Sequence, residues 1–488
     1  MAIASALLRP DLWNALLPAL TSGREAGRRY VSSGKFVPRQ SVTKYEENDA
    51  GWPQTVANRT TPFSRDSDPV DWGELFSLRE GTLSYVLTKH VPELDGFLNE
   101  TSRRALSDEH LMHGLSIVAP YFPDDDQESQ IQHEMITRLI GPILNRADAI
   151  GAEDEDSLRE IYRSVEMARF ADKLTGDVVM PLVAVSFDAP EPVRIDSNIW
   201  IEPLSKADQM ARAMDWSATG SVSPWVSAAA THAVVIRAVT FDNVVQSLSV
   251  LRGQLPEGFG VVDAEIAAEA VTIVTGKPTG HCQVLVRPHG WASGWAQDLP
   301  PLWEAWTGRA YPEILNRRND WDGKFDPISS EQTEKIAKVA GGLRSAPKNI
   351  KVAARRCRRS SFRDEVEDMV LDAAIGIEAL VGKEADAVTH RLAQRTAVAL
   401  RNKLPPEVTY DVTKRFYGIR STVAHGGTPK RWDIDVEGTE YPAVDLGKIL
   451  LRSLLMDWLL AEIPWDATSL DRQMLQLATP PDETDDPA

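Results

Sequence analysis

The chain has 488 residues, of which 43% are hydrophobic and 25% charged, a composition typical of globular proteins and unlike that of disordered chains. Its formal net charge of −18 argues against broad affinity for nucleic acid over the whole surface. No apolar run approaches the roughly 20 residues that span a bilayer, and the two cysteines, Cys282 and Cys357, are too few for a disulfide framework or a zinc site. With no secretory signal recognisable at the N-terminus, we expect a cytoplasmic protein that binds no membrane.

The first part of the chain, residues 1–175, is predicted to consist mostly of helices and loops. A short amphipathic helix is expected over 4–20, polar loops over 22–70, and further helices near 83–87 and over 130–145 and 157–174. The acidic runs at 124–126 and 153–156 are typical of solvated connections. His110 and His113 have the spacing of two metal ligands, but without a recognisable third ligand we assign no metal site.

Residues 176–328 are predicted to form an α+β domain. Short β-branched and apolar runs favour strands over 178–187, 193–195, 198–201 and 231–241. Helices are expected over 205–215 and 242–255, and residues 271–275 and 282–287 are interpreted as a hairpin with a longer loop. Strands interspersed with helices indicate the α+β class.

From residue 329 to 466 the sequence predicts helices and no strand. Ser329 followed by Gln332 is typical of a capping box that begins a helix. Further helices are expected over 349–359, 364–381, 385–401, 406–425 and 445–463, and residues 467–488 are interpreted as an acidic, partly disordered tail. The predicted fold is therefore multidomain, with mixed α/β (α+β) N-terminal and middle regions and an all-α C-terminal bundle.

A basic region lies inside this acidic chain. Residues 344–434 contain 18 Lys and Arg against 11 Asp and Glu. Four of the cations recur at helical spacing and form one stripe on a helix: Lys348, Lys351, Arg355 and Arg359. The stripe either pairs with the acidic remainder of the protein or binds a phosphate backbone, because phosphate binding strengthens with each cation engaged.

The helix expected over 406–425 combines a buried face with polar residues of catalytic type. Four apolar residues recur at helical spacing and define the buried face: Val412, Phe416, Ile419 and Val423. We expect Tyr417, Ser421 and His425 on the opposite, outward face, with Arg420 on the flank between the two.

The segment Arg420-Ser421-Thr422-Val423-Ala424-His425 resembles the Arg-x4-His pattern of the HEPN superfamily, helical bundles that include many ribonucleases. Residues 374–380, which contain Glu378, resemble the helix that precedes this pattern, and residues 392–397, which contain Arg395, resemble the following helix. Residues 417–426 are similar to the Tyr-x-x-Arg-Ser-x-x-x-His-Gly form of ApeA-like HEPN proteins. The resemblance covers residues 345–463, and Ser421 stands where the family often has Asn, Asp or His.

The resemblance implies an endoribonuclease that needs no metal or other cofactor and works as a homodimer through the bundle. It implies catalytic roles for Arg420, Ser421 and His425, with Tyr417, Glu378 and Arg395 in support. By family analogy, the enzyme would act in anti-phage defence or as a toxin, and residues 1–328 would sense a phage-derived or cellular protein trigger. The alternatives are a HEPN module without catalysis, which binds RNA, a nucleotide or a protein partner, and a purely structural dimer module.

Overall fold

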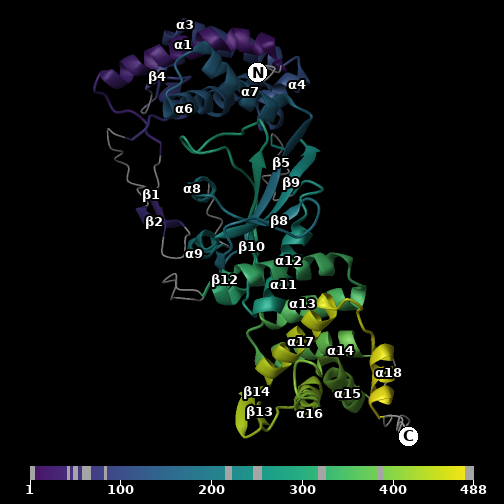
Figure 1. Ribbon diagram of the computed structural model, residues 1–488. Helices are drawn as coiled ribbons and strands as arrows, with labels where there is room; N and C mark the ends of the chain where they lie inside the picture. The colour runs from purple at the N-terminus through teal and green to yellow at the C-terminus, as the bar shows by residue number, and fades with distance from the viewer. Residues whose placement is uncertain are drawn as a thin grey trace, which may run out of the picture.

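The computed structural model describes residues 6–40, 44–47, 53–57, 68–81, 85–214, 222–245, 255–316, 326–382 and 388–478. Helices of the first part of the chain lie at one end of the molecule, a sheet occupies the middle, and the C-terminal helices lie at the other end (Figure 1). The prediction of a mixed helix and sheet protein is confirmed. Within these residues, no helix is both long enough and apolar enough to cross a membrane.

The N-terminal part is a helical unit with its own core, made of buried residues between Leu7 and Phe170. Its helices are α1 (Pro10–Ser32), α2 (Trp72–Leu75), α3 (Pro92–Ala105), α4 (Glu109–Leu115), α5 (Asp124–Met135), α6 (Gly141–Ile150) and α7 (Glu155–Phe170). A π-helical turn, Ile136–Ile140, joins α5 to α6. Short strands pair as β1 (Lys44–Glu47) with β2 (Pro53–Ala57), and as β3 (Phe76–Ser77) with β4 (Val86–Leu87).

The helix expected over 4–20 begins later and extends to Ser32, into the segment predicted as loop. Beyond Leu20 the apolar repeat stops, which is why the sequence indicated an end there. The buried face continues through Gly23 and Gly27 instead, because a Cβ atom at Gly27 would lie only 2.4 Å from the Trp72 ring. Close packing against glycine leaves no hydrophobic signal in the sequence.

The middle part is a six-stranded sheet in the order β11-β10-β5-β9-β8-β7, in which all neighbouring strands are antiparallel. The strands are β5 (Lys173–Pro181), β7 (Val193–Arg194), β8 (Ile199–Pro203), β9 (His232–Asp242), β10 (His281–Pro288) and β11 (Trp303–Ala310). Two short helices accompany it, α8 (Lys206–Met214) and α9 (Pro224–Ala228). Outside the sheet, β6 (Phe187–Asp188) pairs in parallel with β12 (Ile328–Ser329).

The hairpin predicted between 271–275 and 282–287 is wrong. Residues 271–275 are the last turn of helix α11 (Val261–Thr275), and β10 pairs with β5 and β11 instead. The helix is buried along most of its length, so it lacks the polar face that distinguishes an amphipathic helix from a buried strand. Of the helix predicted over 242–255, Asp242 is the end of β9, and residues 246–254 lie outside the described residues.

The C-terminal part follows the predicted order of helices closely. They are α12 (Ser330–Ser345), α13 (Lys348–Ser360), α14 (Val366–Val381), α15 (Val388–Leu400), α16 (Pro406–Ala424) and α17 (Ala443–Leu460). The capping box is confirmed, since the Ser329 side chain accepts from the backbone of Gln332 and the Gln332 side chain accepts from the backbone of Ser329.

Two elements correct the prediction of a strand-free bundle with a disordered tail. Strands β13 (Asp433–Val436) and β14 (Thr439–Pro442) form a hairpin whose turn holds Glu437 and Gly438 at positive φ. Residues 467–478, expected in the tail, form helix α18 (Ala467–Ala478), which buries Leu470. The two carboxylate oxygens of its Asp471 accept hydrogen bonds from Nε and Nη2 of the buried Arg395, each at 2.8 Å. Residues 479–488 lie outside the described residues.

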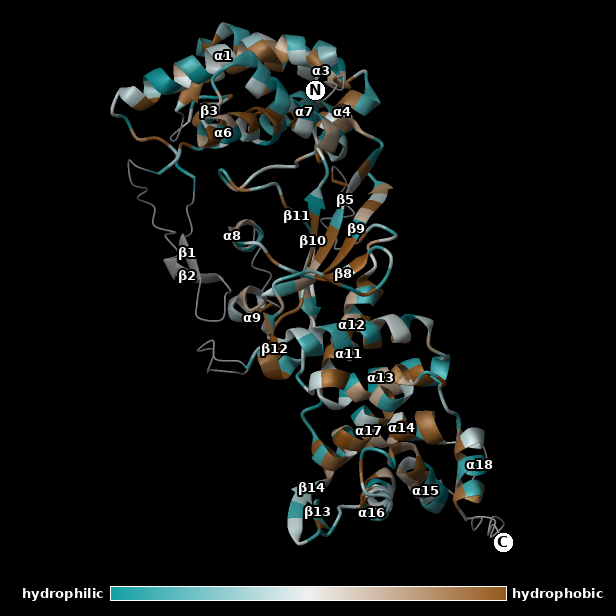
Figure 2. Cartoon of the chain, in the orientation of Figure 1, coloured by the Kyte–Doolittle hydropathy of each residue, from teal (hydrophilic) through white to brown (hydrophobic). Residues whose placement is uncertain are grey.

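One hydrophobic core extends from the sheet into the C-terminal helices. It includes Val284 of β10, Val271 of α11, Ala353 of α13 and Leu451 of α17. In Figure 2 the hydrophobic colour dominates the strands around β8 and β9 and recurs on α14 and α17. Helix α11, which precedes the predicted domain boundary at residue 328, therefore packs among the helices that follow it.

Glycine sets the distance between α16 and α17. A Cβ atom at Gly447 would lie 2.5 Å from the ring of the fully buried Phe416. We expect Gly447→Ala to lower the free energy of unfolding by about 1–3 kcal/mol, because the added methyl group overpacks the core. Denaturation in urea measures this. Gly418→Ala on α16 is the matched control: a Cβ atom there meets no atom within 4 Å, so the same assay should show a gain of roughly 0.5–1 kcal/mol. Equal effects of the two variants would contradict the packing explanation.

Candidate functional site

The end of α16 carries the Arg-x4-His segment. The helix ends at Ala424, and His425 is its C-terminal cap. Gly426 follows with φ +75°, and the backbone N–H groups of Gly426 and Gly427 donate to the carbonyls of Val423 and Thr422, both at 2.9 Å. This left-handed glycine ends the helix and places His425 at its last turn.

Arg420 extends from α16 toward α14. Its Nη2 atom lies 3.1 Å from Oε1 of Glu378, and the arginine side chain is 31% exposed. Burial raises the pKa of Glu378, and the charge of Arg420 opposes that rise. Among the described residues the Nε atom of Arg420 has no hydrogen-bond partner. That Nε atom is itself buried, so the ion pair holds the guanidinium in place and only the exposed part of the side chain can reach another ligand.

Tyr417 does not lie on the outward face, contrary to the prediction. Its side chain is buried, and its hydroxyl donates to the backbone carbonyl of Ala374 on α14 at 3.2 Å. Burial raises its pKa, and the neighbouring Glu378 raises it further. The apolar repeat marked only one line of contact, whereas both α14 and α17 pack on α16 and widen its buried face. The Tyr417 hydroxyl thus joins α16 to α14 inside the bundle.

Ser421 and His425 are exposed, as predicted. Within the described residues, no hydrogen bond or ion pair joins Arg420 to His425. The two side chains leave α16 about 140° apart at 100° per residue. A single copy of the chain therefore does not bring both groups to one point.

Arg395, expected in a supporting role, is fully buried on α15. Besides Asp471 of α18, its guanidinium contacts the carbonyl of Val381 at the end of α14, at 3.0 Å. These contacts tie three helices together. They give Arg395 a structural role in the bundle.

A cavity of about 410 Å³ lies between α16 and the β13–β14 hairpin. It is lined by Gly418 and Thr422 of the motif helix and by three cations, Arg415, Lys430 and Arg431. Arg415 donates to the carbonyl of Asp435 at 2.8 Å, and Arg431 lies 3.3 Å from Glu440. Sequence reasoning missed this cavity because it did not predict the hairpin. Alternation of polar residues over 433–442 was the signal that could have shown it.

The basic stripe lies on α13, where Lys348, Arg355 and Arg359 are exposed. Lys351 is half-buried and donates from Nζ to the carbonyl of Arg344 at 2.8 Å. Three neighbouring cations have internal partners. Arg356 and Arg363 contact Asp372, and Arg358 donates to the carbonyl of Ala310 at 3.1 Å. The stripe therefore remains available to an external partner along three of its four residues.

The same stripe also acts on a buried carboxyl of α11. Burial raises the pKa of Glu269 to about 7, although the charges of Arg358, Arg355 and Arg359 pull it down. Both interpretations of the stripe thus have an observation behind them: an exposed cationic surface and an internal acidic neighbour.

Two further kinds of site, a metal site and a reactive thiol, can be examined in the described residues. The described residues contain no group of three or more His, Cys, Asp or Glu that could hold a metal ion. Both cysteines are buried and unpaired, and burial raises the pKa of Cys282 to about 11 and that of Cys357 to about 12. Neither thiol is therefore an activated nucleophile.

Comparisons with protein-family models, with curated proteins and with solved structures find no match to this chain. The geometry of its own residues must therefore carry any functional assignment.

The raised pKa of Glu269 predicts a pH-dependent stability. The folded chain binds the proton more tightly than the unfolded chain, whose Glu269 titrates near 4.5. Above pH 7 the burial of ionised Glu269 therefore lowers the free energy of unfolding by its full amount. This loss of stability disappears as the pH falls from 7 to 4.5. Relative to the wild type, we expect Glu269→Gln to gain about 2–3 kcal/mol in free energy of unfolding between pH 5 and pH 8.

Urea denaturation at the two pH values checks this prediction. Glu331→Gln, at an exposed position of α12, is the control, because Glu331 is not among the charges that act on Glu269. A difference between Glu269→Gln and the wild type that does not change with pH would show that the carboxyl is ionised at pH 5 in the folded chain as well.

Proposed function

We propose that residues 345–463 form a HEPN-type domain and that the protein is a metal-independent endoribonuclease. The observation that carries this proposal is the arrangement at α16. Arg420 is held by Glu378 with part of its side chain exposed, and His425 lies exposed at the end of the same helix. A phosphate-binding cation and a proton-transfer group are the two parts that RNA cleavage without a metal requires.

The reaction follows from these two groups. The 2′-hydroxyl of RNA attacks the adjacent phosphorus, forms a 2′,3′-cyclic phosphate and releases the 5′-oxygen of the next nucleotide. His425 is suited to take the hydroxyl proton or to return one to the leaving oxygen near neutral pH. Arg420 donates to the phosphate oxygens and stabilises the negative charge that develops on them. Ser421, exposed beside Arg420, is placed to contact the RNA.

The site is completed by a second copy of the chain in this proposal. Arg420 and His425 diverge on one helix, so two copies related by a two-fold axis would supply the missing convergence. Five apolar residues of α17 are buried within the bundle: Ala443, Leu450, Leu451, Leu454 and Leu455. Ile449 on the same helix stays 48% exposed and offers apolar surface to a partner copy.

A HEPN module without catalysis, which binds RNA, a nucleotide or a protein, is the second candidate. The ion pair with Glu378 favours it, because that pair already neutralises part of the Arg420 charge. Incubation of the purified protein with a radiolabelled RNA pool in EDTA separates the two: only the enzyme shortens the RNA.

The biological role we propose is anti-phage defence or toxin-like arrest in the cytoplasm. The N-terminal helical unit and the sheet would then sense a phage-derived or cellular protein and restrain the nuclease until it arrives. This part of the proposal depends on analogy with the family. The shared core between the sheet and the C-terminal helices supports it, since it provides a physical connection.

The catalytic assignment predicts that Arg420→Ala and His425→Ala each reduce RNA cleavage in EDTA by at least a hundredfold. Arg420→Lys should also lose most activity, because it keeps the charge beside Glu378 but not the planar donor fork. Ser421→Asn should keep or raise activity, since it restores a residue common in the family. Gel analysis of labelled RNA measures each rate.

Matched controls come from the same bundle. His390→Ala and Arg401→Ala remove an exposed histidine and an exposed arginine outside the motif, and both should cleave at the wild-type rate. Circular dichroism verifies that each variant is folded. Full cleavage by folded His425→Ala would remove its assigned role, and an active monomer by light scattering would contradict the two-copy site.

The basic stripe predicts a salt-dependent effect on RNA binding. Reversal of Lys348 and Arg359 to Glu should weaken binding to unrelated sequences and lower the slope of log K against log salt by roughly 0.7–0.9 for each lost phosphate contact. The cleavage rate on saturating RNA should change much less, because these side chains position the substrate. Reversal of the exposed Lys335 and Lys338 on α12 is the control. Unchanged affinity with a lowered melting temperature would assign the stripe to internal pairing.

A further inference from the structure

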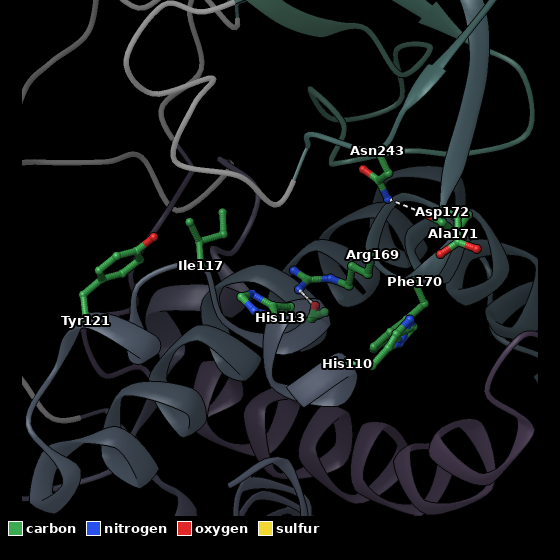
Figure 3. Close-up of a pocket in the computed structure, with 10 residues that line it drawn as sticks. His110, His113, Ile117, Tyr121, Arg169, Phe170, Ala171, Asp172 and Asn243 are labelled. Atoms are coloured by element: carbon green, nitrogen blue, oxygen red, sulfur yellow. Dashed lines mark hydrogen bonds between the residues drawn. The ribbon is translucent and has the colours of Figure 1, made fainter. Parts of the chain in front are cut away.

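A second cavity lies where the N-terminal helical unit meets the sheet. It has a volume of about 390 Å³, within the range of small-molecule sites. His110 and His113 of α4, Arg169 and Phe170 of α7, Tyr121, and Asn243 after β9 are among the residues that line it (Figure 3). The cavity lies far along the chain from the Arg-x4-His segment, so what it binds is a separate question.

Arg169 gives this cavity a buried positive charge that lacks an ion pair. Its side chain is only 7% exposed. Its guanidinium donates to the backbone carbonyls of Gly114, at 2.7 Å, and Arg138. In the part of the chain that the structure describes, no carboxylate lies within ion-pair distance of it. Burial lowers the pKa of Arg169 to about 10, which still leaves it charged at neutral pH.

The nearest buried acid is already engaged elsewhere. The Glu134 carboxylate accepts hydrogen bonds from the Ser116 hydroxyl and the Ile117 backbone N–H, both at 2.9 Å, and lies 3.6 Å from Arg138. Glu134 therefore pairs with Arg138 and not with Arg169. Because a buried charge normally has a partner, the position of Arg169 beside an open cavity indicates that the partner is an anion from outside.

The other lining residues suit an anion joined to a larger group. In Figure 3 the guanidinium end of Arg169 extends toward His113. Histidine N–H groups donate to phosphate or carboxylate oxygens in either protonation state. The His110 and Phe170 rings lie 5.8 Å apart, and Tyr121 is 70% exposed at the edge. Asp172 is the one carboxylate among the described lining residues.

We propose that this cavity binds a small phosphate ester of about mononucleotide size. The phosphate lies against Arg169 and His113. The organic part contacts the Phe170 and His110 rings, because Tyr121 lies on the opposite side of the Arg169–His113 pair (Figure 3). The inference does not depend on ribonuclease activity, because it uses other residues and another part of the fold.

The position of the cavity gives the ligand contact with both parts of the molecule. Helix α7 continues through Ala171 and Asp172 into β5. The Asn243 side chain donates to the carbonyls of Ala168 and Ala171, at 3.0 and 2.8 Å, and its backbone N–H donates to Asp172 at 2.9 Å. A bound phosphate ester therefore stabilises the connection between the helical unit and the sheet.

Calorimetric titration of the full-length protein tests the proposal with four probes: adenosine monophosphate, ribose 5-phosphate, inorganic phosphate and adenosine. We expect both esters to bind and to raise the melting temperature, and adenosine to do neither. Tighter binding of adenosine monophosphate than of ribose 5-phosphate would assign the base to the Phe170 and His110 rings; equal affinity would assign the phosphate and sugar alone.

His113→Ala is the principal variant, because His113 is exposed and its loss costs the core little. Loss of one hydrogen bond to a charged group should weaken ester binding about tenfold. His133→Ala on α5 removes an exposed histidine away from the cavity and should bind as the wild type does. Binding of adenosine as tight as that of its monophosphate, absence of ester binding at millimolar concentration, or unchanged affinity in His113→Ala would each overturn the proposal.

Discussion

Helix α11 packs between the central sheet and the C-terminal helices, and the burial of its surface determines how these two parts meet. Ala264, Ala267 and Val271 are fully buried and allow α12, α13 and α17 to approach closely. A helix that is apolar along most of its surface is stable when neighbouring elements bury it. Its C-terminal carbonyls, at Ile273 and Val274, accept from the Arg452 guanidinium of α17. The sheet and the bundle therefore share one core.

This junction also contains polar groups that are buried away from water. His281 of β10 is fully buried, neither ring nitrogen has a hydrogen-bond partner among the described residues, and burial, with the nearby Arg358, lowers its pKa to about 4. Glu269 and Arg358 lie in the same region. Burial raises the pKa of Glu269 and lowers that of Arg358, which favours the neutral form of each. Such groups cost free energy that apolar burial offsets. A junction of this kind links the ionisation of a few side chains to the contact between the sheet and the C-terminal helices.

The candidate site depends on the packing of α16 against α14. The Tyr417 hydroxyl and the Arg420–Glu378 pair join the two helices, while the left-handed Gly426 ends α16 and leaves His425 exposed. Within this short segment, Arg420 is held by an ion pair, whereas His425 is exposed at the end of the helix. The distance between them around the helix is the reason that the proposed reaction needs two copies of the chain.

The sequence by itself determined the five helices between 348 and 460 and the capping box at Ser329, because helical periodicity and capping depend on residues within a few positions of each other. It also located Arg420 and His425 on one helix and placed His425 outside. Only the tertiary structure decided that residues 271–275 belong to a buried helix and that residues 433–442 form a hairpin. It also decided that Tyr417 points inward and that Arg395 binds α18. Each of these depends on a partner far away in the chain, and contacts at long sequence separation leave no periodic pattern in the segments that make them.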